Sequence, residues 1–194
     1  MRYDTEHKQR TREKILDAAA LAVREEGPTQ VGVAAVMSRA GLTHGGFYAH
    51  FPAKEQLVAA TIGHMFDTTA AQLRQRSEGL PPAQALSGYI EAYLSPWHRD
   101  HRSEGCPMPV LASDVPRLSE PSRQAYAEGV RSLTALLDGW LSALDFVDPN
   151  TLAMSVMSEL VGAISLARAE PDTARSDAIL EATYQQLHFR LGLA

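Results

Sequence analysis

The stretch GLTHGGFYAHF, residues 41–51, decides how the N-terminal part of the chain folds. Phe47 and Phe51 stand four residues apart, so on a helix both rings face one core. Gly45 and Gly46 lie where that helix would begin, although glycine costs roughly 1 kcal/mol against alanine inside a helix. Something other than helix stability must therefore favour small residues at these two positions.

The segments around this stretch predict a cluster of four helices. Thr43 is an N-cap candidate whose hydroxyl would accept a backbone N–H, and Pro52 would close the helix after His50. Upstream, Gly27-Pro28 ends an amphipathic pattern. The four N-terminal helices are therefore expected at 8–26, 33–40, 43–50 and 54–76.

The remainder of the chain also has helical periodicity, and no strand-like alternation persists. After the segment SEGLPP at 77–82 the composition shifts toward longer apolar helices. The expected helices run over 82–97, 106–114, 119–144, 150–169 and 174–191. The fold class is therefore all-α, with a domain at 1–53 and a second at 54–194, joined by the fourth helix.

The composition is that of a soluble globular protein. The 194 residues are 45% hydrophobic and 21% charged, enough to bury a substantial core. Cys106 is the single cysteine, which excludes an intramolecular disulfide. There is no signal-peptide pattern and no long uncharged apolar run, so we expect a cytoplasmic protein without a membrane partner.

Charge is unevenly distributed along the chain. The net charge is −5, yet the first sixty residues carry +1 and the rest −6. Lys8, Arg10, Arg12 and Lys14 fall within seven residues, opposed only by Glu13. Such a run is either a solvated helix face or a surface that meets phosphate.

A helix, a glycine-bearing turn and a short second helix, packed by a longer preceding helix, form a helix-turn-helix. The N-terminal residues of the second helix contact DNA in the major groove. Residues without bulk at 45 and 46 would let the backbone approach base edges and phosphates closely, which explains the two glycines. The positive end of the helix dipole also favours phosphate there.

The block from Arg12 to Val58 resembles the DNA-binding domain of the TetR family of transcriptional regulators. The resemblance rests on TREKILDAAALAVREEG for the first helix, VAAVMSRAGLTHGGFYAHF for the helix-turn-helix and PAKEQLV for the start of the fourth helix. It implies an N-terminal three-helix DNA-binding domain and a C-terminal helical domain that holds an effector and makes a homodimer.

Carried over position by position, the resemblance implies two sets of contacts to double-stranded DNA. The backbone set is Thr43, Tyr48, His50 and Lys54, and the base-edge set is His44, Gly45 and Gly46. The chain departs from the family at two positions before the second helix. Gly32 replaces a capping threonine and Val31 a polar residue, so neither side chain offers a hydroxyl to phosphate.

The last two helices are candidates for the dimer interface. Apolar residues recur at spacings of 4, 3 and 4 in the last helix, as in packed helices, and the helix before it is apolar nearly all round. The candidate dimer residues are Leu152, Val156, Leu160, Leu180, Tyr184, Leu187 and Leu191. The alternative is that both helices complete the core of one chain.

An apolar effector pocket is expected between the helices of the second domain. Its candidate residues are Tyr89, Tyr93, Trp97, Met108, Trp140, Met154 and Met157. Taken singly, each of them is better explained by ordinary core packing. Together they indicate a hydrophobic or aromatic small molecule whose identity cannot be read from the sequence.

The segment WHRDHRSEGCPMPV, residues 97–110, brings His98, His101 and Cys106 close in sequence. A structural zinc module would need a fourth ligand and a different spacing, so no metal is expected. Gly105-Cys106 resembles an element found in one branch of the family, and a thiol at a helix N-terminus can react with oxidants or electrophiles. The alternative is that Cys106 simply packs as a small hydrophobe.

The sequence as a whole indicates a ligand-responsive repressor that binds a near-palindromic operator as a dimer and is released by a small hydrophobic or electrophilic effector. The alternative is a helical small-molecule-binding or interaction protein that does not bind an operator. No nucleophile elbow, Gly-rich phosphate loop or dinucleotide fingerprint is present, so neither catalytic residues nor a cofactor are expected.

Overall fold

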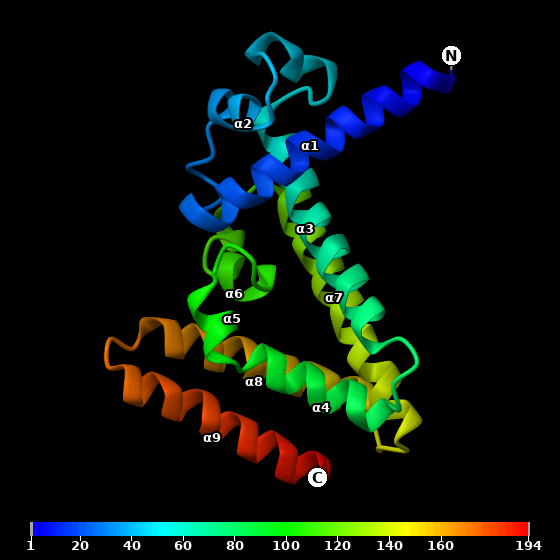
Figure 1. Ribbon diagram of the computed structural model, residues 1–194, viewed down its shortest axis with the longest axis vertical. Coiled ribbons are helices and arrows are strands. Elements are labelled where there is room, and N and C mark those ends of the chain that lie inside the picture. Colours follow the sequence, from blue (N-terminus) through cyan, green and yellow to red (C-terminus); the bar gives the residue numbers. More distant parts are fainter. Residues whose placement is uncertain (1, 194) are drawn as a thin grey trace. The chain divides into compact units, whose positions relative to one another are not determined.

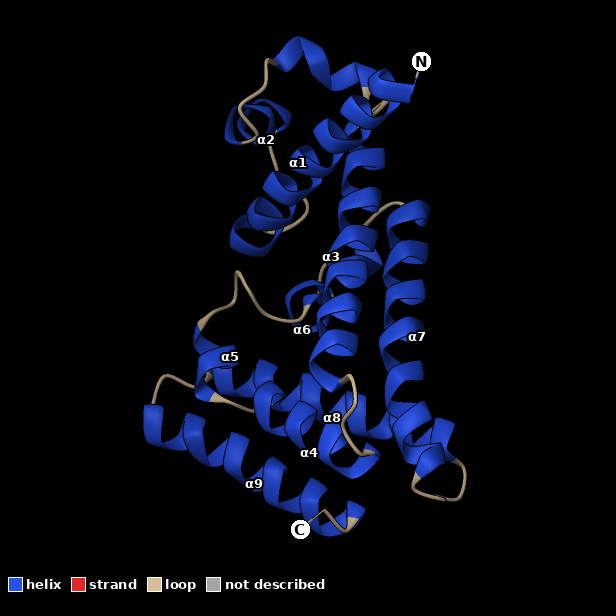
Figure 2. Ribbon diagram, turned by 45° about the vertical axis from the view of Figure 1, so that its right-hand side comes forward, coloured by secondary structure: helices blue, strands red, loops and turns tan. Residues whose placement is uncertain are grey.

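The structure is a computed structural model that describes residues 2–193, with side chains from residue 6 onward. Every regular element in this range is a helix, which confirms the predicted all-α class (Figures 1 and 2). The α-helices are α1 (Arg2–Glu26), α2 (Val33–Arg39), α3 (Lys54–Ser77), α4 (Pro82–Tyr93), α5 (Pro96–Asp100), α6 (Pro107–Leu111), α7 (Glu120–Ala143), α8 (Pro149–Ala169) and α9 (Thr173–Leu191). Two 3-10 helices are η1 (His44–Ala49) and η2 (Val115–Arg117).

The chain forms two compact units. The first unit comprises residues 1–68 and 110–129, and the second comprises 69–109 and 130–194. The boundaries fall inside α3 and α7, so each of these helices contributes residues to both units. The division at residue 53 was predicted on a different ground, because it separates the expected DNA-binding part from the expected effector-binding and dimerisation part. It stays a prediction.

The first unit is built around α1, α2 and η1. Apolar residues of α1 are fully buried, among them Ile15 and Ala19, and α2 packs on both α1 and η1. Gly41 ends α2 with a φ of +71°, and the N–H of Leu42 reaches back to the carbonyl of Met37 at 2.9 Å. This closed turn sets the direction in which η1 leaves α2.

The remaining core of the first unit joins α3 to α7. Phe66 is 1% exposed, and its ring meets the ring of Tyr126 edge-on at 5.5 Å. A Cβ on Gly129 would lie 2.1 Å from the Phe66 ring, so only glycine allows this approach. The Phe66 ring of α3 therefore packs directly against the backbone of α7 at Gly129, and this contact holds the two helices together.

The second unit is a bundle in which α8 lies along α9 and both contact α4 (Figure 1). By length and mean hydropathy α8 alone among the described helices could cross a membrane. Seven of its residues are instead buried in this unit, with Val156 and Leu160 fully enclosed. We therefore assign α8 as the core helix of the bundle.

Several predicted element bounds were wrong. The helix expected at 82–97 ends at Tyr93, because Ser95 and Pro96 start α5, with the Ser95 hydroxyl accepting the N–H of His98 at 3.1 Å. The helix expected at 106–114 is the five-residue α6 followed by η2, which contains Pro116. The helix expected at 43–50 is the 3-10 helix η1.

Candidate DNA interface and core of the second unit

Four of the seven predicted DNA-contact residues are exposed on or beside η1. Thr43, His44, Gly45 and Tyr48 are exposed, and Tyr48 presents 69% of its surface. Beneath them Phe47 is 1% exposed and stacks on Phe51 at 5.9 Å between ring centroids. The buried rings fix the backbone of η1, so the exposed side of this short helix is free to meet a partner.

Neither glycine at the start of η1 is required by the fold. Gly45 and Gly46 do not have positive φ, unlike Gly41. A Cβ on Gly45 would meet nothing within 4 Å, and one on Gly46 would make ordinary contacts, the shortest 3.7 Å to Met37. Packing within the chain thus leaves both glycines unexplained, and the expectation that something outside the chain approaches them stays a prediction.

Two predicted contact residues are engaged differently from the expectation. Thr43 precedes η1 in an extended conformation but makes no side-chain cap hydrogen bond, so the predicted cap was wrong. Its hydroxyl therefore stays available to other partners. The half-buried Lys54 donates from Nζ to the carbonyl of Thr29 at 2.9 Å, which ties the start of α3 to the loop after α1.

The start of α2 is explained by packing. Val31 is 0% exposed and belongs to the core, which accounts for an apolar residue where the family has a polar one. Gly32 is exposed and precedes α2 in an extended conformation without a side-chain cap. The beginning of α2 therefore anchors the fold and offers only backbone groups to a phosphate.

His50 lies at the end of η1, half-buried, with its Nδ1 atom enclosed and without a hydrogen-bond partner. Burial lowers the pKa of this imidazole, and the positive charges of Lys8 and Arg12 lower it further. At neutral pH His50 is therefore a neutral imidazole beside two cations of α1.

The structure brings together four of the seven predicted pocket residues. The ring of Tyr89 lies 5.6 Å from that of Tyr93 and 6.1 Å from that of Trp140, and its hydroxyl donates to Sδ of Met157 at 3.8 Å. Burial raises the pKa of both tyrosines well above 10, so both stay neutral. The Tyr93 hydroxyl is buried and lies beside the Cys106 thiol.

The other three predicted pocket residues differ in burial. Met108 is buried at 2% exposure. Trp97 is 51% exposed and stacks on the His101 ring at 4.6 Å, and Met154 is 50% exposed on α8. Including Trp97 and Met154 in a closed pocket was wrong, because helix periodicity alone did not show that α5 is a separate short helix and that Met154 faces outward.

Cys106 is buried next to His98 in the second unit. The Cys106 N–H donates to Nε2 of His98 at 3.0 Å, and the Nδ1 atom of the same ring lies 2.7 Å from the carbonyl of Tyr93. Burial lowers the pKa of His98 to about 4, with the nearby Arg168 contributing in the same direction. Both ring nitrogens are thus used, and the neutral imidazole positions the backbone at Cys106.

Sequence reasoning missed Gly105 and Arg168 as supports of this arrangement. A Cβ on Gly105 would stand 2.7 Å from the His98 ring, so glycine is needed for the approach. Arg168 donates to the carbonyls of His98 and Arg99 at 2.7 and 3.0 Å, which fastens α5 to α8. The Gly-Cys dipeptide was the available signal for Gly105, whereas nothing in the sequence marks an arginine that binds carbonyls.

A second polar contact joins α5 to α9. Arg99 donates to Ser176 Oγ at 2.9 Å and pairs with Asp177 and Asp100. An open hollow of about 440 Å³ lies beside this network, lined by Arg99, Asp100, Ala167, Arg168, Glu170, Thr173 and Ser176. The hollow is polar and separate from the aromatic cluster, so it is a poor match for a hydrophobic effector.

The predicted dimer seam is buried inside one chain. Val156, Leu160, Leu180, Leu187 and Leu191 are each 0–4% exposed. Assigning them to a dimer contact was wrong, because the spacing that suits packing between helices is used here for packing α8 on α9. Leu152 and Tyr184 are half-buried, and the outer surfaces of the same helices expose Met154, Leu166 and Phe189.

Comparison with known proteins shows which class of protein has this architecture: the helix-turn-helix regulators. Residues 15–61 match the bacterial regulatory proteins of the tetR family, and residues 82–182 match the C-terminal domain of LmrA/YxaF-like transcriptional regulators. The chain therefore belongs to the TetR family.

Relatives and solved structures agree with this assignment. An HTH-type transcriptional regulator of Mycobacterium tuberculosis is 30% identical over 179 residues, covering 87% of this chain and 89% of its own. The HTH-type transcriptional repressor NemR of Escherichia coli is 29% identical over 140 residues, 71% of this chain and 69% of its own. The structure of reduced NemR superposes with a TM-score of 0.79 at 23% identity over 91% of this chain and 94% of NemR.

Proposed function

We propose that this DNA-binding regulator is a cytoplasmic dimeric repressor that binds a near-palindromic operator and is released by a small hydrophobic or electrophilic effector. The observation that carries the proposal is the η1 surface, where exposed residues stand on a buried aromatic pair. In particular, Gly45 and Gly46 have no packing or conformational role within the chain. Both glycines are explained if another molecule must approach this surface closely.

The DNA contacts divide into two kinds under this proposal. Tyr48 and Thr43 hold phosphates, with Lys54 and His50 close to the backbone, whereas His44 and the two glycines face base edges. Lys54 keeps its bond to the carbonyl of Thr29 through one donor and has two further N–H donors for phosphate. The phosphate contacts set affinity, and the base-edge contacts set sequence preference.

The dimer uses the outward surface of α8 and α9. Three large apolar side chains face outward from the two helices: Phe189 is 86% exposed, Leu166 is 63% exposed and Met154 is 50% exposed. A two-fold contact on this surface would cover them and pair two helices from each subunit into a four-helix interface. Two η1 elements would then read half-sites about one turn of DNA, roughly 34 Å, apart.

The effector acts through the second unit. The aromatic cluster of Tyr89, Tyr93 and Trp140 supports an apolar or aromatic ligand, because three aromatic rings from two helices lie together there. A ligand that prefers a conformation with α3 displaced would weaken operator binding, and operator would weaken ligand binding by the same factor.

Cys106 is the residue that would react with an electrophilic effector. It is 7% exposed, and its thiol lies near the hydroxyls of Tyr89 and Tyr93, whose pKa values it helps to raise. The dipole of α6 contributes little here, because that helix has five residues. Cys106→Ser should therefore abolish release of DNA by the thiol-alkylating probe N-ethylmaleimide, and unchanged release would remove the cysteine from the mechanism.

Fluorescence anisotropy tests the operator directly. Purified protein is titrated on a labelled duplex from the DNA flanking its own gene and on a shuffled duplex of equal composition, at two salt concentrations. We expect saturable, salt-sensitive preference for the flanking duplex, because several phosphate contacts release counterions. Equal binding to both duplexes would contradict the operator proposal and favour a small-molecule-binding or interaction protein.

A pair of variants separates the two kinds of contact in the same assay. Tyr48→Phe removes a phosphate donor and should weaken binding to both duplexes by a similar factor. His44→Ala should alter the ratio between the two duplexes, because it faces base edges. If both variants changed only the overall affinity, the assignment of His44 to base recognition would be wrong.

A further inference from the structure

Two cations of α1 lie beside the end of η1 within the first unit. Lys8 and Arg12 are four residues apart, so they share one face of α1. Both lie close enough to His50 for their charges to lower the pKa of its imidazole. This face of α1 therefore places two positive charges beside His50, a predicted contact to the DNA backbone at the end of η1.

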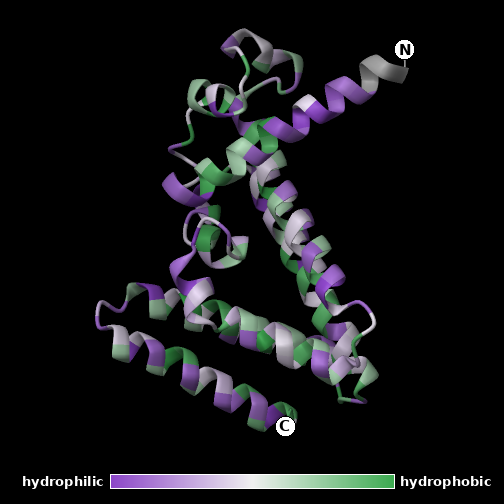
Figure 3. Cartoon of the chain, in the orientation of Figure 1, coloured by the Kyte–Doolittle hydropathy of each residue, from purple (hydrophilic) through white to green (hydrophobic). Residues whose placement is uncertain are grey.

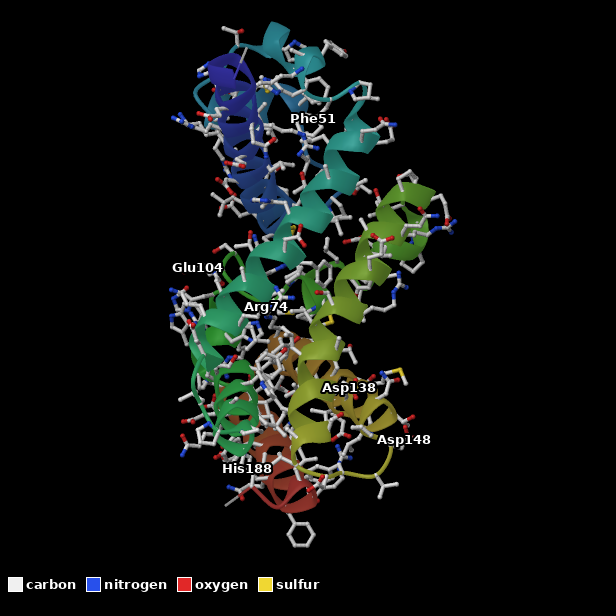
Figure 4. The ribbon with its side chains drawn as sticks, turned by 90° about the vertical axis from the view of Figure 1, so that its right-hand side faces the viewer. Phe51, Arg74, Glu104, Asp138, Asp148 and His188 are labelled. Carbon is white, nitrogen blue, oxygen red and sulfur yellow. The ribbon has the colours of Figure 1, made fainter. Side chains whose placement is uncertain are left out.

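Arg12 is held in place by the aromatic core of the helix-turn-helix. Its guanidinium carbon lies 4.8 Å from the centroid of the Phe51 ring. Phe51, which is labelled in Figure 4, is 1% exposed and stacks on Phe47. A cation that stacks on a ring keeps its N–H donors at the edge of the guanidinium plane. Arg12 is thus positioned before any partner arrives.

No carboxylate pairs with Lys8 or Arg12 among the residues whose side chains are described. The other faces of α1 are different: on the opposite side Arg10 pairs with Glu6 at 3.7 Å, and on the adjacent face Gln9 donates to Glu13 at 2.9 Å. Beyond the grey residues at its start, the N-terminal half of α1 is mostly hydrophilic (Figure 3). Among the described side chains of α1, the face that carries Lys8 and Arg12 combines positive charge, no paired carboxylate and proximity to η1.

We propose that Lys8 and Arg12 form a phosphate clamp that holds the DNA backbone beside the end of η1, which makes α1 a third DNA-contacting element. This inference rests on the proposed operator binding. A duplex DNA backbone fits because it presents regularly spaced phosphates to two cations about one helical turn apart. The clamp contacts no base, so it adds affinity equally on every sequence.

The test compares two double variants with the same loss of charge. Lys8→Gln with Arg12→Gln removes the clamp, and Arg10→Gln with Lys14→Gln is the control. Each control residue lies two positions after a clamp residue, roughly 200° round the helix. Anisotropy titrations of wild type and both variants are made on the flanking and shuffled duplexes between 50 and 200 mM salt, with thermal unfolding followed by circular dichroism.

The clamp predicts a specific change in salt dependence. Each lost phosphate contact lowers the slope of log affinity against log salt by about 0.9, so the double variant should lose about 1.8. Over the fourfold salt range, wild type should therefore lose about 12-fold more affinity than the clamp variant on either duplex. Lys8→Gln alone should show half the change in slope, and its exposed side chain makes it a safe variant if Arg12→Gln unfolds the first unit.

Two results would overturn the clamp: slopes for the clamp and control variants that change equally, or weakening confined to the flanking duplex. The proposed function fails separately, when wild type binds both duplexes with equal affinity, and the slope comparison still decides the clamp in that case. If wild type binds neither duplex, both proposals are wrong.

Discussion

The surface of η1 and the apolar seam of α9 were both predicted to meet a partner, and the structure treats them in opposite ways. On η1, Tyr48 is 69% exposed above a buried Phe47. On α9, Leu180 and Leu187 are 3% and 0% exposed because α8 of the same chain covers them. Packing within one chain therefore explains the leucines of the seam, whereas it leaves the exposed residues of η1 without a role.

The largest expected effect is on the free energy of unfolding, which should respond very differently to substitutions in the α9 seam and on the outer surface of the same helix. Leu187→Ala should lower the free energy of unfolding by about 2–5 kcal/mol through loss of burial and an internal cavity. Phe189→Ser, at an 86% exposed position, should change it by less than about 0.5 kcal/mol in the monomer. Urea unfolding at low protein concentration measures both.

Sedimentation of the same two variants then locates the dimer face. Phe189→Ser should raise the dimer dissociation constant, and Leu187→Ala should act only through stability. A dimer weakened by Leu187→Ala but untouched by Phe189→Ser would restore the seam as the interface.

The second effect concerns the buried imidazole of the second unit. Because burial lowers the pKa of His98 to about 4, the unfolded chain takes up a proton below pH 6.5 while the folded chain does not. The free energy of unfolding should thus fall as pH falls from 6.5 to 4, by about 3 kcal/mol in total from this residue. His98→Gln should flatten that part of the pH profile in urea unfolding, and a profile identical to wild type would contradict the role of burial.

The third effect tests the support of Cys106. Gly105→Ala places a Cβ 2.7 Å from the His98 ring, which two hydrogen bonds hold in place. We expect a loss of about 1–3 kcal/mol in thermal or urea unfolding, typical of overpacking in a core. Gly139→Ala, on α7 with no atom within 4 Å of the added Cβ, is the matched control and should not destabilise.

The sequence predicted most of the fold because its punctuation is strong. Gly27-Pro28, Gly41 and Pro52 end three helices of the first unit where expected, and Pro149 begins α8. Periodicity also identified the apolar face of α9 correctly. It could not show which neighbour covers that face, because a partner helix from the same chain and one from a second chain require the same spacing.

The candidate site was predictable only in part, for a similar reason. Residue type identified the exposed positions of η1 and the Tyr89, Tyr93 and Trp140 cluster. The role of Arg168 depends on backbone carbonyls, which are invisible in a side-chain pattern. The position of Lys8 and Arg12 depends on the angle at which α1 passes η1, which no local pattern specifies.

The smallest expected effect on stability occurs at Gly45. Alanine there has room for its Cβ and an ordinary φ, so the free energy of unfolding should stay unchanged or rise by up to about 1 kcal/mol. Its effect on DNA should be much larger, because an added methyl group would separate η1 from the base edges. A loss of stability on Gly45→Ala would instead give this glycine a role within the chain.

The affinity of the Gly45→Ala variant for the flanking duplex, measured beside wild type at one salt concentration, tests the central claim most directly. The account predicts at least tenfold weaker binding, about 1.4 kcal/mol, in a variant no less stable than wild type. Wild-type affinity and preference in that variant would contradict the claim that DNA approaches the backbone of η1 at this glycine.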